Sequence, residues 1–173
     1  MKKRVTKGFW IWGQFDNQST TNLNKIYKNI NNNLKGPLFE LHLTLSGPIK
    51  NKNKEIINKF FLLKKMIELI EIETADYLYS ENYYESLFIK IKKSNELMNL
   101  KFTIDKTFNL SNKEYNPHIS LFYGNTLEEK KLEIISKTSK PPKRIKLKKL
   151  CLVNIEENIN KWKIEDKIVL NNS

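Results

Sequence analysis

The sequence contains one four-residue pattern twice, and each copy begins with one of the chain's two histidines. The copies are His42-Leu43-Thr44-Leu45 and His118-Ile119-Ser120-Leu121, in which polar and apolar residues alternate. Such alternation is typical of a β-strand with one buried face, because successive side chains in a strand point to opposite sides. Each copy therefore predicts a strand that presents a histidine and a hydroxyl on one face and anchors two apolar side chains in a core.

Hydrophobic periodicity places the two histidine strands in a plan that occurs twice along the chain. In the first half we expect a strand, a helix, the first histidine strand and a helix, at residues 8–15, 19–34, 39–48 and 54–68. In the second half we expect two strands, a helix, the second histidine strand and a helix, at residues 69–79, 85–92, 94–108, 117–124 and 126–138. Two strands at 143–155 and 161–170 follow. The expected helix caps include Ser19 or Thr20 and Ser94.

This order predicts an α+β fold with an internal pseudo-two-fold axis. We expect residues 1–173 to form a single domain of two pseudo-symmetric lobes, one for each histidine motif, since the length suits one core. Antiparallel sheets would form a central cleft and the helices would lie outside. The two histidine strands would then lie side by side or across a groove, although the histidines are 76 positions apart.

Composition limits the class of protein without defining it. The net charge of +12 permits an anionic substrate, but the bias towards lysine, asparagine and isoleucine is also what an AT-rich coding sequence produces. Lysines interrupt the longest apolar stretches, so we expect no membrane span, and the basic N-terminus lacks the features of a secretory signal. The single cysteine, Cys151, cannot form an internal disulfide and is interpreted as a core thiol. We expect a cytoplasmic protein, a monomer by default.

The paired motifs suit acid–base chemistry at phosphorus. Near neutral pH one imidazole can accept a proton while the other donates one, because an ordinary histidine titrates near pH 6.5. Thr44 and Ser120 lie on the same faces as the histidines and could hydrogen-bond the non-bridging phosphoryl oxygens. Such a site needs no cofactor, and the few candidate ligands near the motifs predict no metal site. For a single histidine, a half-buried polar role with no function is the simpler interpretation.

The motifs, with the segments around them, resemble the two-histidine (2H) phosphoesterase superfamily, which includes bacterial 2′-5′ RNA ligase-like proteins and cyclic phosphodiesterases of plants and yeast. The segments that carry the resemblance are residues 9–12, 39–47 and 117–124 and the strand expected around Trp162. Their order is most similar to the cyclic phosphodiesterase branch. The chain departs from this branch at Leu41, where the family often has proline.

The resemblance implies a bilobal fold and assigns roles by motif. His42 and His118 would be the catalytic acid–base pair, and Thr44 and Ser120 the phosphate-binding hydroxyls. Tyr123 is similar to an aromatic residue near the phosphate or base, and Trp12 to one that lines the cleft; core packing explains either residue equally well. Strict alternation places Tyr123 on the opposite face from Ser120, so its role requires the strand to end or bulge there.

The expected function is metal-independent hydrolysis of a cyclic phosphate, in a 2′,3′-cyclic nucleotide, an RNA 2′,3′-cyclic end or ADP-ribose 1″,2″-cyclic phosphate. One alternative is a nuclease for 2′-5′ oligoadenylates or cyclic oligonucleotide signals. The other is a non-catalytic RNA-binding module. The sequence leaves open which histidine is the acid and which the base.

Two further features have competing explanations. The basic run at residues 140–149 is explained more simply by a solvated strand face, with Ile145 and Leu147 turned inward, than by a strip that binds RNA weakly. Four tyrosines could either stack on bases or pack across strands. They are Tyr77, Tyr79, Tyr83 and Tyr84.

Overall fold

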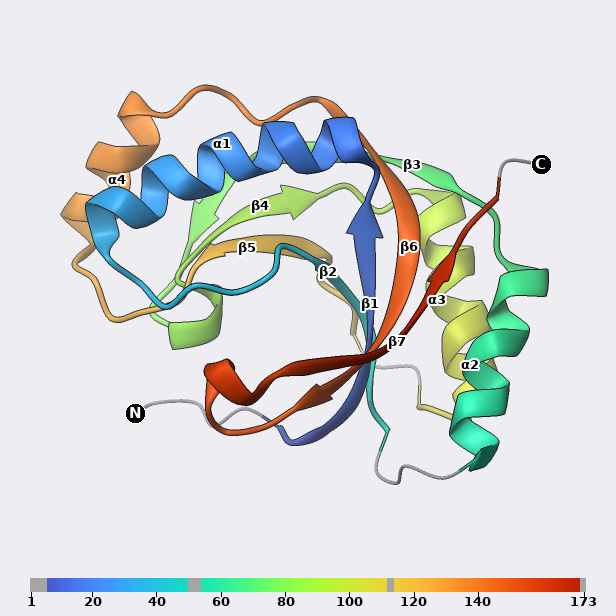
Figure 1. The fold of residues 1–173 in the computed structure, drawn as a ribbon. Coiled ribbons are helices and arrows are strands. Elements are labelled where there is room, and N and C mark those ends of the chain that lie inside the picture. Colours follow the sequence, from blue (N-terminus) through green and yellow to red (C-terminus); the bar gives the residue numbers. More distant parts are fainter. Residues whose placement is uncertain (1–5, 50–53, 112–113, 172–173) are drawn as a thin grey trace.

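The computed structural model describes residues 6–49, 54–111 and 114–171, in which one antiparallel sheet is flanked by helices (Figure 1). The strands are β1 (Gly8–Phe15), β2 (Leu43–Ile49), β3 (Ile70–Tyr79), β4 (Leu87–Ile91), β5 (His118–Phe122), β6 (Arg144–Ile155) and β7 (Lys163–Val169). The helices are α1 (Asn17–Leu34), α2 (Lys54–Met66), α3 (Asn95–Phe108) and α4 (Glu128–Lys137), with short 3-10 turns η1 (Tyr83–Glu85) and η2 (Ile159–Lys161). The predicted α+β class is confirmed.

The seven strands are ordered β1-β2-β5-β4-β3-β6-β7, and β1 also pairs with β6. The sheet therefore curls back on itself through β6, whose first residues pair with β3 and whose later residues pair with β1 and β7. The two histidine strands, β2 and β5, are direct neighbours in this sheet.

Each half of the chain sends a helix onto the histidine strand of the other half. Helix α1 packs on β5, and α3 packs on β2, so the two contacts are related as an internal two-fold axis requires. The helices also meet across the halves, because α1 contacts α4 while α2 contacts α3. The two helix pairs lie on different sides of the strands (Figure 1).

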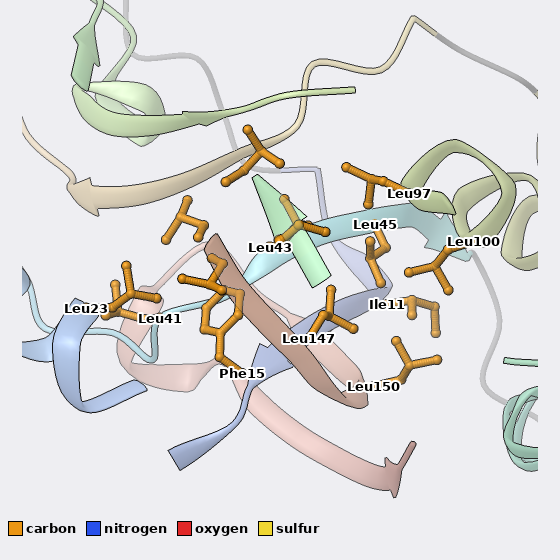
Figure 2. Close-up of a cluster of buried hydrophobic side chains, with 14 of the residues drawn as sticks. Ile11, Phe15, Leu23, Leu41, Leu43, Leu45, Leu97, Leu100, Leu147 and Leu150 are labelled. Carbon is orange, nitrogen blue, oxygen red and sulfur yellow. The ribbon is translucent and has the colours of Figure 1, made fainter. Parts of the chain in front are cut away.

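The apolar positions of both histidine motifs lie in the core. Leu43, Leu45, Ile119 and Leu121 are at most 1% exposed. Figure 2 shows Leu43 and Leu45 in one cluster with Ile11 of β1, Leu147 of β6 and side chains from α1 and α3. Burial of each of these four side chains contributes about 1.5–3 kcal/mol to the stability of the fold. Because the apolar face of each strand must therefore point into the core, the histidines are left on the opposite face.

The predicted N-cap residue is confirmed for α3 and is wrong for α1. Ser94 caps α3, as predicted, by accepting the N–H of Leu97 at 3.2 Å. Helix α1 is capped by Asp16, which accepts the N–H of Ser19 at 2.8 Å, and not by Ser19 or Thr20. The cap therefore lies three residues before the first of the expected caps, and the Ser19 hydroxyl instead accepts the N–H of Lys146 in β6.

The first histidine strand is shorter than predicted. Pairing in β2 begins at Leu43, while the Phe39 N–H donates to the Tyr27 hydroxyl of α1 at 2.8 Å rather than to a neighbouring strand. His42 thus lies immediately before the first residue of β2. Within the described ranges, no helix is long and apolar enough to cross a membrane.

Candidate active site

The pairing of β2 with β5 brings the two motifs together. Leu43 is the Cα partner of Ile119, and these are the residues that directly follow the two histidines. Continuing this antiparallel register by one residue in each direction sets His42 opposite Ser120 and Thr44 opposite His118. All four polar side chains then share the face opposite to the buried leucines and isoleucine.

A pocket of about 250 Å³ opens on this face. All six residues singled out in the sequence line it: Trp12, His42, Thr44, His118, Ser120 and Tyr123. The others that line it are Thr6, Trp10, Asn82, Tyr84, Glu85, Ile155 and Trp162. The structure therefore gathers residues from both halves of the chain around a single cavity.

Both histidines are held by the same backbone contact. His42 Nδ1 lies 2.6 Å from the Glu40 carbonyl oxygen, and His118 Nδ1 lies 2.9 Å from that of Asn116. Because a carbonyl can only accept, Nδ1 must carry the proton in each ring. This arrangement leaves Nε2 of each histidine for chemistry and fixes the ring orientation.

The environment of His42 favours its neutral form. Its ring stacks on that of Trp12, with centroids 3.5 Å apart and planes 6° from parallel, and the residue is only 6% exposed. Burial, together with the nearby charge of His118, lowers the pKa of His42 to about 4, although the contact with the Glu40 carbonyl opposes the shift. At neutral pH, His42 is therefore a neutral imidazole that carries its proton on Nδ1 and has a free lone pair on Nε2. His118 is half-buried, so the two imidazoles occupy unequal environments.

Tyr123 reaches the pocket because β5 ends and bulges before it. The pairing of β5 with β4 shifts by one residue between Ser120 and Phe122, which turns Phe122 into the core. Tyr123 then stacks on Phe39, with centroids 3.9 Å apart, and its hydroxyl interacts with that of Ser120. Burial raises the pKa of Tyr123 well above its ordinary value, so its hydroxyl is a donor at neutral pH.

Ser120 is held in the pocket by a turn between β3 and β4. It is 5% exposed, and its hydroxyl donates to the Tyr84 carbonyl at 3.2 Å. The Gly124 N–H donates to the Tyr83 carbonyl at 3.0 Å, which ties the end of β5 to the same turn.

A buried ion pair in α3 contacts β2. Lys101 Nζ lies 2.5 Å from an Asp105 carboxylate oxygen within α3, and the Ser46 hydroxyl of β2 donates to the same carboxylate. The Tyr115 hydroxyl donates to the Thr44 carbonyl at 3.0 Å. These contacts fix the backbone of β2 on both sides of Leu45 and so position Thr44.

Sequence reasoning missed the residues that form the outer part of the pocket. Asn82, Tyr84 and Glu85 come from η1 and the residue before it, and Trp162 follows η2. Tyr84 is one of the four tyrosines that the sequence assigned either to stacking on bases or to packing across strands, and of these four it is the one that lines the pocket. The Tyr77 hydroxyl instead donates to the Ser139 carbonyl after α4, and the Tyr79 hydroxyl donates to the Glu128 carboxylate at the start of α4.

The basic run and Cys151 have the packing that their structural interpretations predict. Ile145 and Leu147 are buried as expected, while Arg144 of the basic run pairs with Glu71 at 3.1 Å. Cys151 is fully buried, and burial raises the pKa of its thiol to about 12, which agrees with a core thiol. Among the described residues, no group of three or more His, Cys, Asp and Glu side chains could hold a metal ion.

Comparison with known proteins identifies the class. The fold resembles that of E. coli LigT bound to 3′-AMP, with a TM-score of 0.63 at 12% identity over 95% of this chain and 97% of that chain. It also resembles TT0787 of Thermus thermophilus, with a TM-score of 0.61 at 13% identity over 95% and 98% of the two chains. The fold also resembles that of Usb1 of Kluyveromyces marxianus, with a TM-score of 0.50 at 14% identity over 96% of this chain and 99% of that chain. The chain therefore shares the fold of these solved structures.

The family follows from sequence. The model of the cyclic phosphodiesterase-like proteins matches residues 11–170, which include both histidine motifs. The chain belongs to this family, and the resemblance noted in the sequence is confirmed. A comparison with curated protein sequences finds no match.

Proposed function

We propose that this protein is a metal-independent phosphodiesterase that hydrolyses a cyclic phosphate on a ribose, with His42 and His118 as its general base and general acid. The observation that carries the proposal is the gathering of both histidines and both motif hydroxyls around one pocket, each imidazole presenting Nε2. The family supports phosphoesterase chemistry.

The two roles are assigned from the unequal environments of the histidines. A general base must be unprotonated in the resting enzyme, and buried His42, whose pKa is lowered to about 4, meets this condition at neutral pH. The more exposed His118 takes the complementary role of acid.

The reaction is an in-line displacement at phosphorus. His42 Nε2 removes a proton from water as the water oxygen bonds to phosphorus. The bond from phosphorus to the ribose 2′ or 3′ oxygen breaks, and His118 gives its proton to that oxygen. The products are a phosphomonoester and a free ribose hydroxyl, so atoms and charge balance.

The developing charge on the non-bridging oxygens needs hydrogen-bond donors. Thr44 and Ser120 lie opposite His118 and His42 across the strand pair. The Thr44 hydroxyl meets this need, and the Ser120 hydroxyl meets it when its proton turns from the Tyr84 carbonyl to the phosphate. The Tyr123 hydroxyl, which stays protonated at neutral pH, is a third donor beside Ser120. Trp12 acts on His42 by excluding water from one face of its ring.

The substrate is a nucleotide, an RNA 2′,3′-cyclic end or ADP-ribose 1″,2″-cyclic phosphate. LigT has been crystallised with 3′-AMP and with ATP, which supports a nucleotide as the bound group in a pocket of this fold. The aromatic side chains around the histidines are suited to a base.

Substrate assays with excess EDTA test the proposal. The purified protein should hydrolyse 2′,3′-cyclic nucleotides or ADP-ribose 1″,2″-cyclic phosphate to phosphomonoesters, detected by chromatography. Turnover of 2′-5′ oligoadenylates alone would point instead to the nuclease alternative. Absence of turnover on all of these, combined with RNA binding that survives His42→Ala and His118→Ala, would favour the RNA-binding module.

A further inference from the structure

Three aromatic rings beside the histidines form a slot. The rings of Tyr84 and Trp162 face each other at 28° with centroids 6.3 Å apart. The Tyr123 ring is steeply inclined to both, at 71° and 66°, with centroids 5.4 and 6.0 Å away. Tyr84 and Trp162 are thus the walls and Tyr123 the floor of this aromatic slot. A flat ring between two walls needs about 7 Å in all, so a small outward movement of one wall admits a base.

The slot adjoins the proposed reaction centre. Trp162 contacts Trp12 edge to face with centroids 5.8 Å apart, and Trp12 stacks on His42. The floor residue, Tyr123, interacts with Ser120. A base held in the slot would therefore place its ribose phosphate beside the two histidines.

A carboxylate also lines this pocket, where a phosphate-binding site has no evident need for one. Glu85 is half-buried, and in the described ranges its side chain makes no hydrogen bond or ion pair. Of the described pocket-lining residues, none is lysine or arginine. A carboxylate in that position repels phosphate unless the substrate supplies donors to it.

The turn that carries Glu85 is well fixed. The Glu85 N–H donates to the Asn82 carbonyl at 3.0 Å, and the Glu85 carbonyl accepts the Ser80 hydroxyl at 2.8 Å. The Asn82 side-chain oxygen accepts the Tyr84 N–H at 3.3 Å, which leaves the Asn82 amide nitrogen as the donor end of that side chain. One short turn thus brings a carboxylate acceptor and an amide donor to the slot.

Guanine is the base whose edge matches this pair of groups. It alone among the four RNA bases places two N–H donors side by side, N1–H and N2–H₂, next to an O6 acceptor. A carboxylate accepts two adjacent donors, and an amide N–H₂ group suits O6. Resting on the proposed function, we propose that Tyr84, Trp162 and Tyr123 hold a guanine whose edge is read by Glu85 and Asn82, so that the substrate is a guanosine cyclic phosphate or an RNA end that terminates in guanosine.

The test compares the four 2′,3′-cyclic nucleotides as substrates. Wild-type kcat/KM should be highest for the guanosine compound, by roughly tenfold to a hundredfold, as expected for one bidentate contact. Glu85→Gln replaces one acceptor by a donor, a pattern that pairs with the edge of adenine, so the guanine-to-adenine ratio should fall at least tenfold. Glu81→Gln is the matched control, because Glu81 is exposed and lines a different pocket; it should keep the wild-type ratio.

Binding separates this inference from the proposed function. Quenching of tryptophan fluorescence by 3′-GMP, 3′-AMP and 3′-UMP needs no turnover, and 3′-GMP should bind tightest to wild type and lose that advantage in Glu85→Gln. Equal kcat/KM values for all four cyclic nucleotides, or a guanine preference that survives Glu85→Gln, would overturn guanine recognition. If none of the four is hydrolysed and ADP-ribose 1″,2″-cyclic phosphate is not hydrolysed either, the proposed function fails, and the binding series alone decides whether guanine is recognised.

Discussion

Burial sets the proposed division of roles between the two histidines. His42 is covered by Trp12, and the low pKa that results keeps its imidazole neutral, whereas His118 is half-buried. The two rings share the same backbone anchor, so the roles follow from the surroundings of each ring and not from its tautomer.

The acid side of the pH–rate profile should report His42. Protonation of a general base abolishes its function, so kcat/KM should fall as the pH falls through about 4 and not near 6.5. Trp12→Ala exposes the imidazole and should move this limb up towards pH 6.5, while Trp12→Phe, which keeps a ring over His42, should move it less. A wild-type limb near pH 6.5 would contradict the assignment of His42 as the buried base.

A change of leaving group should distinguish the acid from the base. Bis(p-nitrophenyl) phosphate releases an anion that departs without protonation, so the general acid matters little for it. We expect His118→Ala to lose far less activity on this diester than on a cyclic nucleotide, whereas His42→Ala should lose similar factors on both. Measured rates showing the opposite pattern would exchange the two roles.

At the scale of secondary-structure elements, α3 contains a buried ion pair whose carboxylate also binds Ser46 of the first histidine strand. Lys101→Met would leave the Asp105 carboxylate buried without its partner, and should lower the free energy of unfolding by about 3–5 kcal/mol. The double variant Lys101→Met/Asp105→Leu removes both charges and should cost less than the single one. Urea unfolding measures the free energy of unfolding of both variants. Equal decreases in the two variants would show that the unpaired charge does not cause the loss of stability.

The histidine strands could be predicted from sequence because their signal is local. Alternation around His42 and His118 shows which side chains share a face, and the buried leucines and isoleucine make that face certain. The outer pocket has no such signal. Glu85 and Trp162 lie in turns whose positions depend on pairing between distant strands, so nothing near them in sequence indicates that they meet. The Tyr123 position depends on a bulge, which strict alternation cannot predict.

At the scale of the whole molecule, the helix contacts interlock the two halves. Because α1 packs on β5 and α3 on β2, neither histidine strand is covered by its own half alone. We propose that the chain is therefore one folding domain of two pseudo-symmetric lobes, and not two lobes with separate stabilities.

Equilibrium unfolding tests this proposal. All three tryptophans line the pocket, so their fluorescence reports on the surroundings of the pocket, while far-ultraviolet circular dichroism reports chiefly on the helices. The two transitions in urea should superimpose, as expected for a two-state domain. Separate midpoints would show that the lobes unfold independently.

The most direct test of the central claim is the rate of 2′,3′-cyclic nucleotide hydrolysis, in excess EDTA, by wild type, His42→Ala and His118→Ala. The account predicts metal-independent turnover by wild type and a loss of roughly 10²–10⁴-fold in kcat/KM in each variant, because each removes one partner of an acid–base pair. Folding of the variants is checked by circular dichroism. Wild-type activity retained by either folded variant would contradict a mechanism in which both histidines transfer protons.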